Sequence, residues 1–321
     1  MSEPGRDRVE TAAAADVIQA VTDNLARVVH APEETLRLTA LCLVAEGHLI
    51  LEDFPGVGKT MLAKALARSL DVSFSRMQFT PDLLPSDVTG VNVFNQRSNE
   101  FEFKPGPVFA NLLLVDEINR ASPKTQAALL ECMQEQQVTI DGVSYGLGRP
   151  FMVMATQNPI EYEGTYPLPE AQLDRFTMRI AIGYPPLAEE AKMLTEQTAD
   201  PPLEALQPVA SAADAVALAE DAKGIFVEES LNRYVVALLR ATRVDSRLYL
   251  GASPRAGIAL LRVAKARALA DGREFLEPDD VKAVAVPVLA HRLILAPEAR
   301  AGGMTGERVI EETLEKTPVP V

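Results

Sequence analysis

The sequence predicts an α/β protein with a mostly parallel sheet flanked by helices, followed by a smaller, all-helical domain. Two observations support this fold class. In the first part of the chain, short apolar runs alternate with segments of helical periodicity, which is the pattern of parallel strands joined by helices. Beyond residues 183–186 only helical patterns are evident. We therefore expect a flexible tail over residues 1–14, an α/β domain over 15–186 and a helical domain over 187–321.

The strands of the α/β domain are predicted from short apolar runs. Two helices within residues 15–46, separated at Pro32, come before the first run. The runs cover residues 49–51, 72–79, 112–115, 151–155 and 176–182. Helices are expected between some of them, at 61–70 and 123–137. Short runs of this kind are typical of strands buried on both faces of a parallel sheet.

Two segments interrupt the alternation of strands and helices. Residues 91–103 and 138–145 are rich in β-prone side chains, and the second contains Asp141-Gly142, a strong hairpin signal. We interpret both as hairpins inserted into the α/β domain. Two surface loops are the alternative.

The helical domain is predicted from its apolar periodicity. The expected helices cover residues 188–198, 209–222, 228–244, 254–270 and 277–291. The last residues, EKTPVPV, are expected to be a frayed end.

Composition and charge narrow the class of protein. With 47% hydrophobic and 24% charged residues, the chain of 321 residues has an ordinary globular composition. A net charge of −14 argues against nucleic acid as the main partner, because duplex binding needs clustered Lys and Arg. Cys42 and Cys132 lie in apolar helical patterns, so we interpret them as reduced core residues. His30, His48 and His291 are far apart in sequence, which disfavours a histidine-based metal or catalytic site.

The start of the chain, MSEPGRDRVETAAAAD, carries charges where a signal peptide needs an apolar core. No stretch approaches the roughly 18 apolar residues of a membrane span. We therefore expect a cytoplasmic protein without a membrane span.

A candidate phosphate-binding loop follows the first predicted strand. LEDFPGVGKT ends like the pattern G-x-x-x-x-G-K-[ST], but Asp53 stands where the first glycine is usual. Gly56 and Gly58 let the backbone approach phosphate closely, and the following helix offers its N-terminal amides. Lys59 would face the β- and γ-phosphates, and Thr60 would offer its hydroxyl to Mg²⁺.

Two adjacent carboxylates end the apolar strand Leu112–Val115. Side chains alternate along a strand, so Asp116 and Glu117 point differently. We assign Asp116 to a metal ion and Glu117 to general base for an attacking water. A strand that simply ends in acids is the alternative, and the loop upstream makes it less favoured.

Three further polar residues lie near element ends. Asn158 comes shortly after the strand predicted over residues 151–155. It is therefore expected at the carboxyl edge of the parallel sheet, where ligands bind. Arg175 precedes the last strand, where an exposed ion pair is the plainer interpretation. Arg255 lies in the first turn of a helix with Ser253 as N-cap, where the helix dipole disfavours a cation and a bound phosphate would offset that cost. An exposed arginine tolerated at small cost is the alternative.

Together, LEDFPGVGKT, LLLVDEINRA, ATQNP, LPEAQLDRF and GASPRA resemble the AAA+ ATPases, and specifically their MoxR branch. The resemblance covers about residues 20–295. MoxR-like proteins often carry an acidic residue at the position of Asp53, where a side chain can point away from the phosphates. The resemblance implies a P-loop AAA+ core and a smaller, helical lid domain.

The resemblance also implies a role for each matching residue. Lys59 and Thr60 match the Walker A lysine and metal-binding hydroxyl, and Asp116 and Glu117 match Walker B. Asn158 matches the first sensor and Arg255 the second. Arg175 matches the arginine finger that one subunit offers to its neighbour, and the two hairpins match the family's inserts. The implied nucleotide-binding residues are Pro55, Gly56, Val57, Gly58, Lys59, Thr60 and Met61.

One segment departs from the family. Members commonly have a Val-Ile/Val-Gly-Gln segment near the adenine, whereas this chain has Val28-Val29-His30-Ala31-Pro32. The adenine contacts are therefore not assigned.

These observations favour an ATP hydrolase that depends on Mg²⁺ and forms a ring, expected to have six subunits. Its expected work is chaperone-like remodelling or maturation of a partner protein, and the resemblance implies a partner with a von Willebrand factor A domain. A DNA-translocating motor is one alternative, against which the acidic charge counts. A nucleotide-gated scaffold with little turnover is the other, against which Glu117 and Arg175 count.

Overall fold

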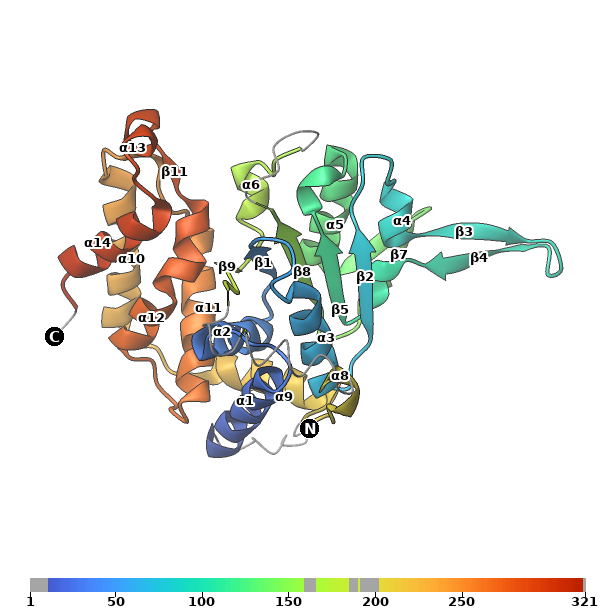
Figure 1. Ribbon diagram of the computed structural model, residues 1–321, viewed down its shortest axis with the longest axis horizontal. Coiled ribbons are helices and arrows are strands. Elements are labelled where there is room, and N and C mark those ends of the chain that lie inside the picture. Colours follow the sequence, from blue (N-terminus) through green and yellow to red (C-terminus); the bar gives the residue numbers. More distant parts are fainter. Residues whose placement is uncertain (1–10, 159–165, 185–189, 191–201, 320–321) are drawn as a thin grey trace, which may run out of the picture.

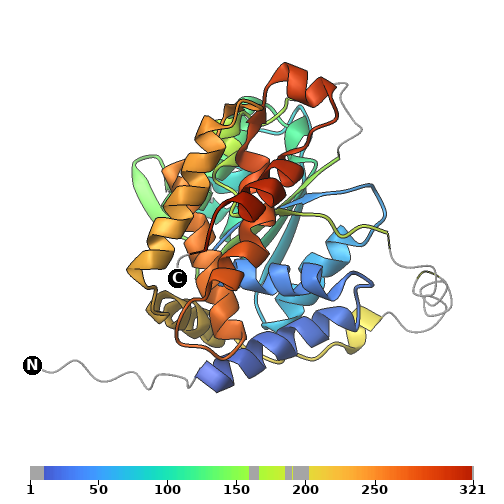
Figure 2. The same ribbon diagram turned by 90° about the vertical axis from the view of Figure 1, so that its left-hand side faces the viewer.

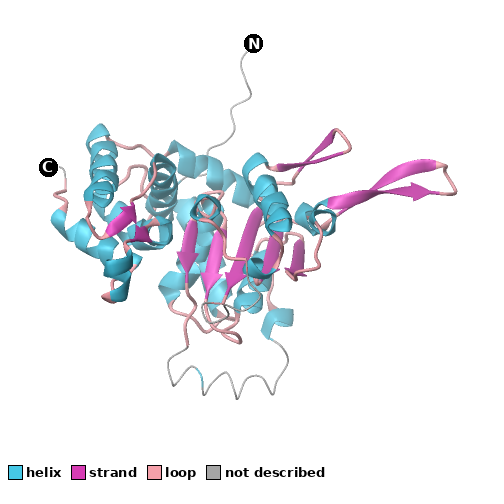
Figure 3. Cartoon of the chain, turned by 90° about the horizontal axis from the view of Figure 1, so that it is seen from above, coloured by secondary structure: helices cyan, strands magenta, loops and turns pink. Residues whose placement is uncertain are grey.

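The computed structural model describes residues 11–158, 166–184, 190 and 202–319. Seen from above, a parallel sheet lies between a group of helices at one end and two hairpins at the other (Figure 3). The helix expected over 188–198 lies outside the described residues except at 190. No helix in the described ranges is long and apolar enough to cross a membrane.

The sheet has five strands in the order β2-β5-β8-β1-β9, and every pair is parallel. Its members are β1 (Leu49–Glu52), β2 (Phe74–Gln78), β5 (Leu112–Asp116), β8 (Met152–Gln157) and β9 (Met178–Ile180). All five expected strands are therefore present. Because the strands are parallel, their carboxyl ends share one edge, where Gln78 pairs with Asp116 and Glu52 with Gln157.

Alternation along the strands gives the sheet two apolar faces. Leu49 and Leu51 pack in one cluster with helices α1 (Thr11–Ala26), α2 (Glu33–Val44) and α3 (Lys59–Ser69). Ile50 packs in the other cluster with α5 (Pro123–Glu135), beside the short α4 (Pro85–Thr89). Helix α1 begins at Thr11, ahead of the expected start at residue 15, and lies along the foot of the molecule (Figure 2).

Cys42 and Cys132 are buried in these two clusters, which confirms that they are core residues. Burial raises the pKa of the Cys132 thiol to about 12, so this thiol stays protonated at neutral pH. His48 and His291 are also buried, in separate places.

Both predicted hairpins are confirmed. One consists of β3 (Gly90–Asn95) and β4 (Glu100–Pro105) and projects far from the sheet (Figure 1). The other consists of β6 (Gln137–Ile140) and β7 (Val143–Gly146). Its turn residues, Asp141 and Gly142, have φ of 50° and 82°, as a two-residue turn of this kind requires. The two hairpins are in contact: Tyr145 of β7 stacks on Phe103 of β4, with ring centroids 4.2 Å apart.

Helices α10 to α14, residues 229–316, form what we call the helical part. Its helices are α10 (Glu229–Val244), α11 (Pro254–Ala270), α12 (Pro278–Leu289), α13 (Pro297–Ala301) and α14 (Gly306–Lys316). Helices α13 and α14 follow the last helix that the sequence pattern predicted. Of two helices before it, α8 (Pro202–Ala205) packs against α3, and α9 (Ala212–Gly224) packs against both α2 and α11.

The expectation of helices alone beyond residue 186 needs correction. Strands β10 (Leu248–Leu250) and β11 (Ile294–Leu295) form a small antiparallel pair within the helical part. The sequence pattern missed this pair because strands of two or three residues are too short to show alternation.

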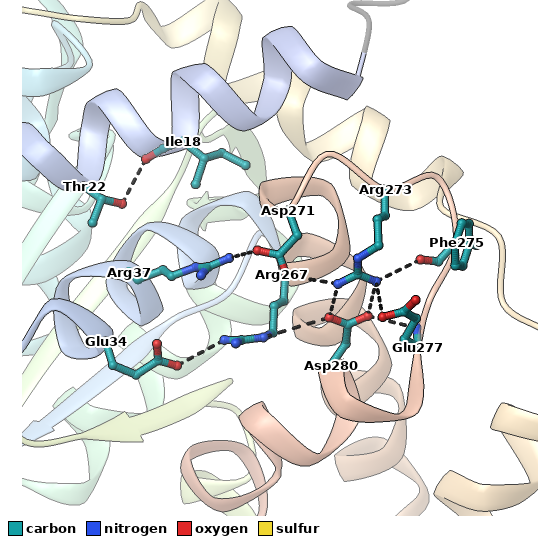
Figure 4. Close-up of polar contacts among 10 residues, drawn as sticks. All are labelled: Ile18, Thr22, Glu34, Arg37, Arg267, Asp271, Arg273, Phe275, Glu277 and Asp280. Carbon is teal, nitrogen blue, oxygen red and sulfur yellow. Dashed lines mark hydrogen bonds and ion pairs between the residues drawn. The ribbon is translucent and has the colours of Figure 1, made fainter. Parts of the chain in front are cut away.

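Ion pairs join the helical part to helix α2 (Figure 4). Arg37 of α2 pairs with Asp271, and Glu34 lies 3.2 Å from Arg267. On the helical side, Arg273 lies 2.5 Å from the buried carboxylate of Asp280. The network fixes the end of α11 beside α2, on the far side of the helical part from α13 (Figure 1).

Candidate functional site

A cavity of about 410 Å³ lies at the carboxyl edge of the sheet. Four segments meet there: the loop from β1 to α3, and the ends of β2, β5 and β8. The lining residues are Pro55, Gly56, Gly58, Lys59, Thr60, Met61, Arg76, Gln78, Asp116, Glu117, Thr156 and Asn158. The structure thus brings the predicted loop, both predicted carboxylates and the predicted amide into one cavity.

The loop between β1 and α3 needs glycine at two positions. Gly56 and Gly58 have φ of 87° and 97°, in the left-handed region that residues with a Cβ rarely adopt. Gly58 is also the N-cap of α3 and offers no side chain to the first amides of that helix. These amides therefore remain available for an anion in the cavity.

Lys59 is folded back along its own loop. Its Nζ donates to the carbonyl oxygen of Asp53 at 2.6 Å and to that of Phe54 at 3.1 Å. Partial burial lowers the pKa of this ammonium, and the charges of Asp53, Asp116 and Glu117 oppose that effect. The ammonium thus rests on neutral carbonyl groups, which an anionic ligand can replace as its partners.

Asp53 points out of the loop, which explains why no glycine is needed at this position. Its Oδ2 accepts the N–H groups of Ile182 and Gly183, both at 2.7 Å, and its Oδ1 accepts the N–H of Phe54 at 2.9 Å. Only 5% of Asp53 is exposed. Tyr184, next along the chain, stacks on Phe54 with centroids 5.8 Å apart. Asp53 therefore ties the base of the loop to the segment after β9.

The two carboxylates at the end of β5 both line the cavity, and β5 ends at Asp116, so strand alternation does not reach Glu117. Glu117 has φ of 55° and ψ of 54°, a left-handed conformation that is uncommon for a residue with a side chain. Thr156 of β8 holds both residues: its Oγ1 accepts the N–H of Glu117 at 2.9 Å and donates to Asp116 at 3.3 Å. Glu117 Oε2 lies 3.0 Å from the Nε of Arg120. The strained backbone is thus supported from a neighbouring strand.

Arg76, Gln78 and Thr156 are site residues that sequence reasoning missed. Arg76 Nε lies 2.6 Å from Asp116 Oδ2, so a cationic group already faces this carboxylate. Arg76 and Gln78 stand two positions apart on β2 and share one side of the strand, which was the available signal. That β2 lies beside β5 could not be read from the sequence.

Two predicted residues and one loop residue are not among those that line the cavity. Arg175 follows α6 (Glu170–Leu173) and is half-buried, and Arg255 is exposed in the first turn of α11. Neither side chain makes a hydrogen bond or ion pair within the described part of the chain. Val57 instead packs against the apolar cluster beneath the loop.

The comparisons with known proteins agree with this arrangement. Residues 48–178 match the ATPase family associated with various cellular activities (AAA), and residues 240–313 match the AAA lid domain. The chain is 47% identical over 299 residues to the uncharacterized protein YeaC of Bacillus subtilis, covering 93% of each chain. It is 43% identical over 303 residues to Chaperone MoxR1 of Mycobacterium tuberculosis, covering 92% of this chain and 80% of that one.

A third relative is Protein MoxR of Methylorubrum extorquens, which is 32% identical over 328 residues, with 92% of this chain and 93% of that one covered. The chain belongs to the MoxR family of AAA+ ATPases. A provisionally assigned ATPase from Cytophaga hutchinsonii is similar to this MoxR-family chain throughout. Its crystal structure has a TM-score of 0.90 and 41% identity, and the match covers 97% of each chain.

Proposed function

We propose that this MoxR-family protein hydrolyses ATP with Mg²⁺ in the cavity at the carboxyl edge of its sheet. The observation that carries the proposal is the convergence there of a phosphate-type loop with Asp116, Glu117 and Asn158. In this function, the loop amides and Lys59 hold the β- and γ-phosphates. Of the predicted nucleotide-binding residues, Pro55 to Gly58 lie in the loop and Lys59 to Met61 in the first turn of α3.

Magnesium fits the donors on one side of the cavity. The Thr60 hydroxyl and the Asp116 carboxylate are both hard oxygen donors, and both line the cavity. Asp116 already faces a cationic group, the guanidinium of Arg76. When bound, the ion would neutralise charge on the phosphates. For Asp116 to serve the ion, Arg76 must release it.

Glu117 is the residue we assign to activation of the attacking water. Its backbone is fixed by Thr156, and its carboxylate lines the same cavity as Lys59. Asn158, which follows β8 and lines the same cavity, is assigned to orient that water or the γ-phosphate. Arg255 is assigned to the second sensor, since phosphate near the N-terminus of α11 would offset the cost of a cation there.

Arg175 is assigned to the neighbouring subunit's nucleotide. It does not line the cavity of its own chain and has no partner within the described ranges. A ring, which we propose to have six subunits, would bring it against the next cavity. We further propose a cytoplasmic chaperone-like role on a client protein, of the class with a von Willebrand factor A domain. We also propose the domain division at residue 186.

The test is Mg²⁺-dependent phosphate release from ATP by the wild-type protein and by Glu117→Gln. The variant should bind a fluorescent ATP analogue normally and release phosphate slower by on the order of 10²–10⁴, since it keeps the shape of the side chain but loses the base. Glu131→Gln, the same change at an exposed site, is the control and should match wild type. Absence of turnover by wild type contradicts the function, and normal turnover by Glu117→Gln contradicts the assigned base.

A further inference from the structure

The residues on both sides of Arg175 are held by side chains of the helical part. Arg292, at the end of the short helix η3 (Ala290–Arg292), donates from its terminal guanidinium nitrogen to the carbonyl oxygen of Phe176 at 2.7 Å and to that of Asp174 at 3.4 Å. His291 Nε2 lies 3.2 Å from the same Phe176 oxygen. The backbone that carries Arg175 is thus positioned by the helical part, although the Arg175 side chain is left for another role.

The carboxylate of Asp174 joins two separate places in the helical part. Its Oδ1 lies 2.9 Å from the Nε of Arg292, and its Oδ2 accepts the hydroxyl of Ser253 at 3.3 Å. That hydroxyl also caps α11, accepting the N–H of Ala256 at 3.1 Å. Arg255 lies in the same first turn. Asp174 therefore contacts the helix end that carries Arg255 and stands directly before Arg175 in the chain.

Burial makes this arrangement hard to break. The Arg292 side chain is 3% exposed and that of Asp174 is 21% exposed, so separating them would leave a buried charge without its partner. Arg292 also donates to the carbonyl oxygen of Val288 in α12 at 2.7 Å. Burial lowers the pKa of Arg292 to about 10, Asp174 opposes this, and the positive charge of Arg255 adds to it. Arg255 thus acts electrostatically on the same pair.

We propose that Asp174 is a positioning residue through which the helical part sets the place of Arg175. A phosphate bound near Arg255 draws the first turn of α11 toward it, and Ser253 and Asp174 move with that turn. Arg175, the next residue, then moves relative to the neighbouring subunit. Nucleotide in one subunit would in this way control the arginine offered to the next. The inference rests on the proposed function, in which Arg175 and Arg255 act on phosphate.

The main test uses Asp174→Asn, which keeps the size of the side chain and removes its charge. We expect ATP affinity to stay near wild type and kcat to fall on the order of 10–100-fold, since a displacement of about 1 Å at a catalytic group can cost 10²-fold. Mixing this variant with Glu117→Gln should raise turnover, because Glu117→Gln subunits bind ATP without hydrolysing it and offer an Arg175 set by nucleotide to a neighbouring site with intact chemistry. Mixing with Lys59→Ala, which does not bind ATP, should rescue less. A merely structural role would give no such rescue.

Asp280→Asn is the matched control for loss of a buried acid. Asp280 pairs with Arg273 inside the helical part. Its substitution should lower the melting temperature and should cause no loss of kcat that mixing with Glu117→Gln rescues. A second pair of variants avoids the risk of unfolding. Ser253→Asp and Ser253→Asn both keep a good N-cap. Only Ser253→Asp places a second carboxylate against Asp174 and should reduce kcat.

Three outcomes would overturn the inference: normal kcat in Asp174→Asn, a loss of kcat that mixing does not rescue, or equal kcat in the two Ser253 variants. Failure of the proposed function gives a different result from failure of this inference. In that case wild type itself releases no phosphate, or Arg175→Ala turns over normally in the same assay.

Discussion

Asp53 and Thr156 shape the candidate site through bonds to backbone groups. Asp53 anchors the base of the loop to Ile182 and Gly183, and Thr156 holds the strained Glu117. These three hydrogen bonds join residues that are far apart in the chain. A buried donor or acceptor that loses its partner costs about 1–3 kcal/mol, so each bond keeps the loop or the carboxylate in one place. Precise placement of these groups is what the proposed chemistry needs.

His48 shows how a buried residue can make stability depend on pH. Its Nδ1 accepts the N–H of Val153 at 3.0 Å, and its Nε2 lies 3.2 Å from the carbonyl oxygen of Met133. These contacts suit the neutral ring with its proton on Nε2. Burial lowers the pKa of His48 from 6.5 to about 4. Because the unfolded chain binds this proton more readily, folding is favoured above pH 6.5 and is weakened as the pH falls towards 4.

We predict that His48→Gln makes the stability less sensitive to acid. Gln can donate and accept as the neutral ring does, but it does not titrate. Between pH 7 and 4, the free energy of unfolding of wild type should fall by about 3 kcal/mol more than that of the variant. Urea unfolding at several pH values measures this difference. Parallel curves for the two proteins would show that the pKa of His48 is not depressed.

At the scale of elements, the two hairpins stand apart from the cavity. Phe94 and Phe101 near the end of β3–β4 are largely exposed, as is Val143 on β7. By contrast, Val138 at the base of β6 is buried in the core. The base of this second hairpin therefore belongs to the fold. Its turn at Asp141-Gly142 is exposed, and the Asp141 carboxylate accepts the side-chain amide of Asn92 in the first hairpin at 2.6 Å. We propose that this turn faces the pore of the ring or the client.

Replacing residues 139–144 with a short Gly-Ser turn should separate these roles. Because Val138 and Tyr145 remain, we expect normal folding and ATP binding, with a loss of client that co-purifies with the ATP-trapped Glu117→Gln protein. The control variant keeps the wild-type length of the hairpin and Asp141-Gly142, and it carries Ser and Thr at the other positions of residues 139–144. It separates the effect of the side chains from the effect of the hairpin length. Unfolding of the shortened protein would instead make the hairpin a structural element.

At the scale of the whole molecule, the site of a single chain is incomplete under the proposed mechanism. The cavity contains the loop, both carboxylates and Asn158, while Arg175 and Arg255 lie outside its lining. The ion pairs from Glu34 and Arg37 to the end of α11 hold the helical part beside α2. Helix α11 also packs against α1 and α9 through the main apolar cluster, so apolar contacts as well as ion pairs dock the helical part.

Arg175→Ala separates a ring ATPase from a monomeric one. The variant should bind ATP nearly normally and hydrolyse it more slowly, by on the order of 10³–10⁵ if the residue acts as arginine fingers do. Mixing with Lys59→Ala should restore part of the phosphate release, because an intact nucleotide site then faces an intact arginine. Arg255→Ala, which acts within its own subunit, should not be rescued.

Two results would contradict this view of Arg175. One is near-normal turnover by Arg175→Ala. The other is hydrolysis that does not depend on protein concentration down to a range in which light scattering detects only monomers.

The sequence alone determined the features that depend on neighbours in the chain. Periodicity located the strands and most of the helices. β-Prone residues located both hairpins, the second with the help of its Asp141-Gly142 turn. The spacing of the glycines and Lys59 located the loop, and the acids after an apolar run located Asp116 and Glu117. These signals are local, because period, caps and turns involve residues only a few positions apart.

The tertiary structure decided which distant residues meet. Arg76 joined the site because β2 pairs with β5, and Asp53 turned away from the loop because the segment after β9 offered it two amides. The contact from Ser253 to Asp174 spans 79 positions of the chain. The pairing of such residues depends on the order of strands and the docking of helices. Both are set by the packing of whole apolar faces, which no local pattern encodes.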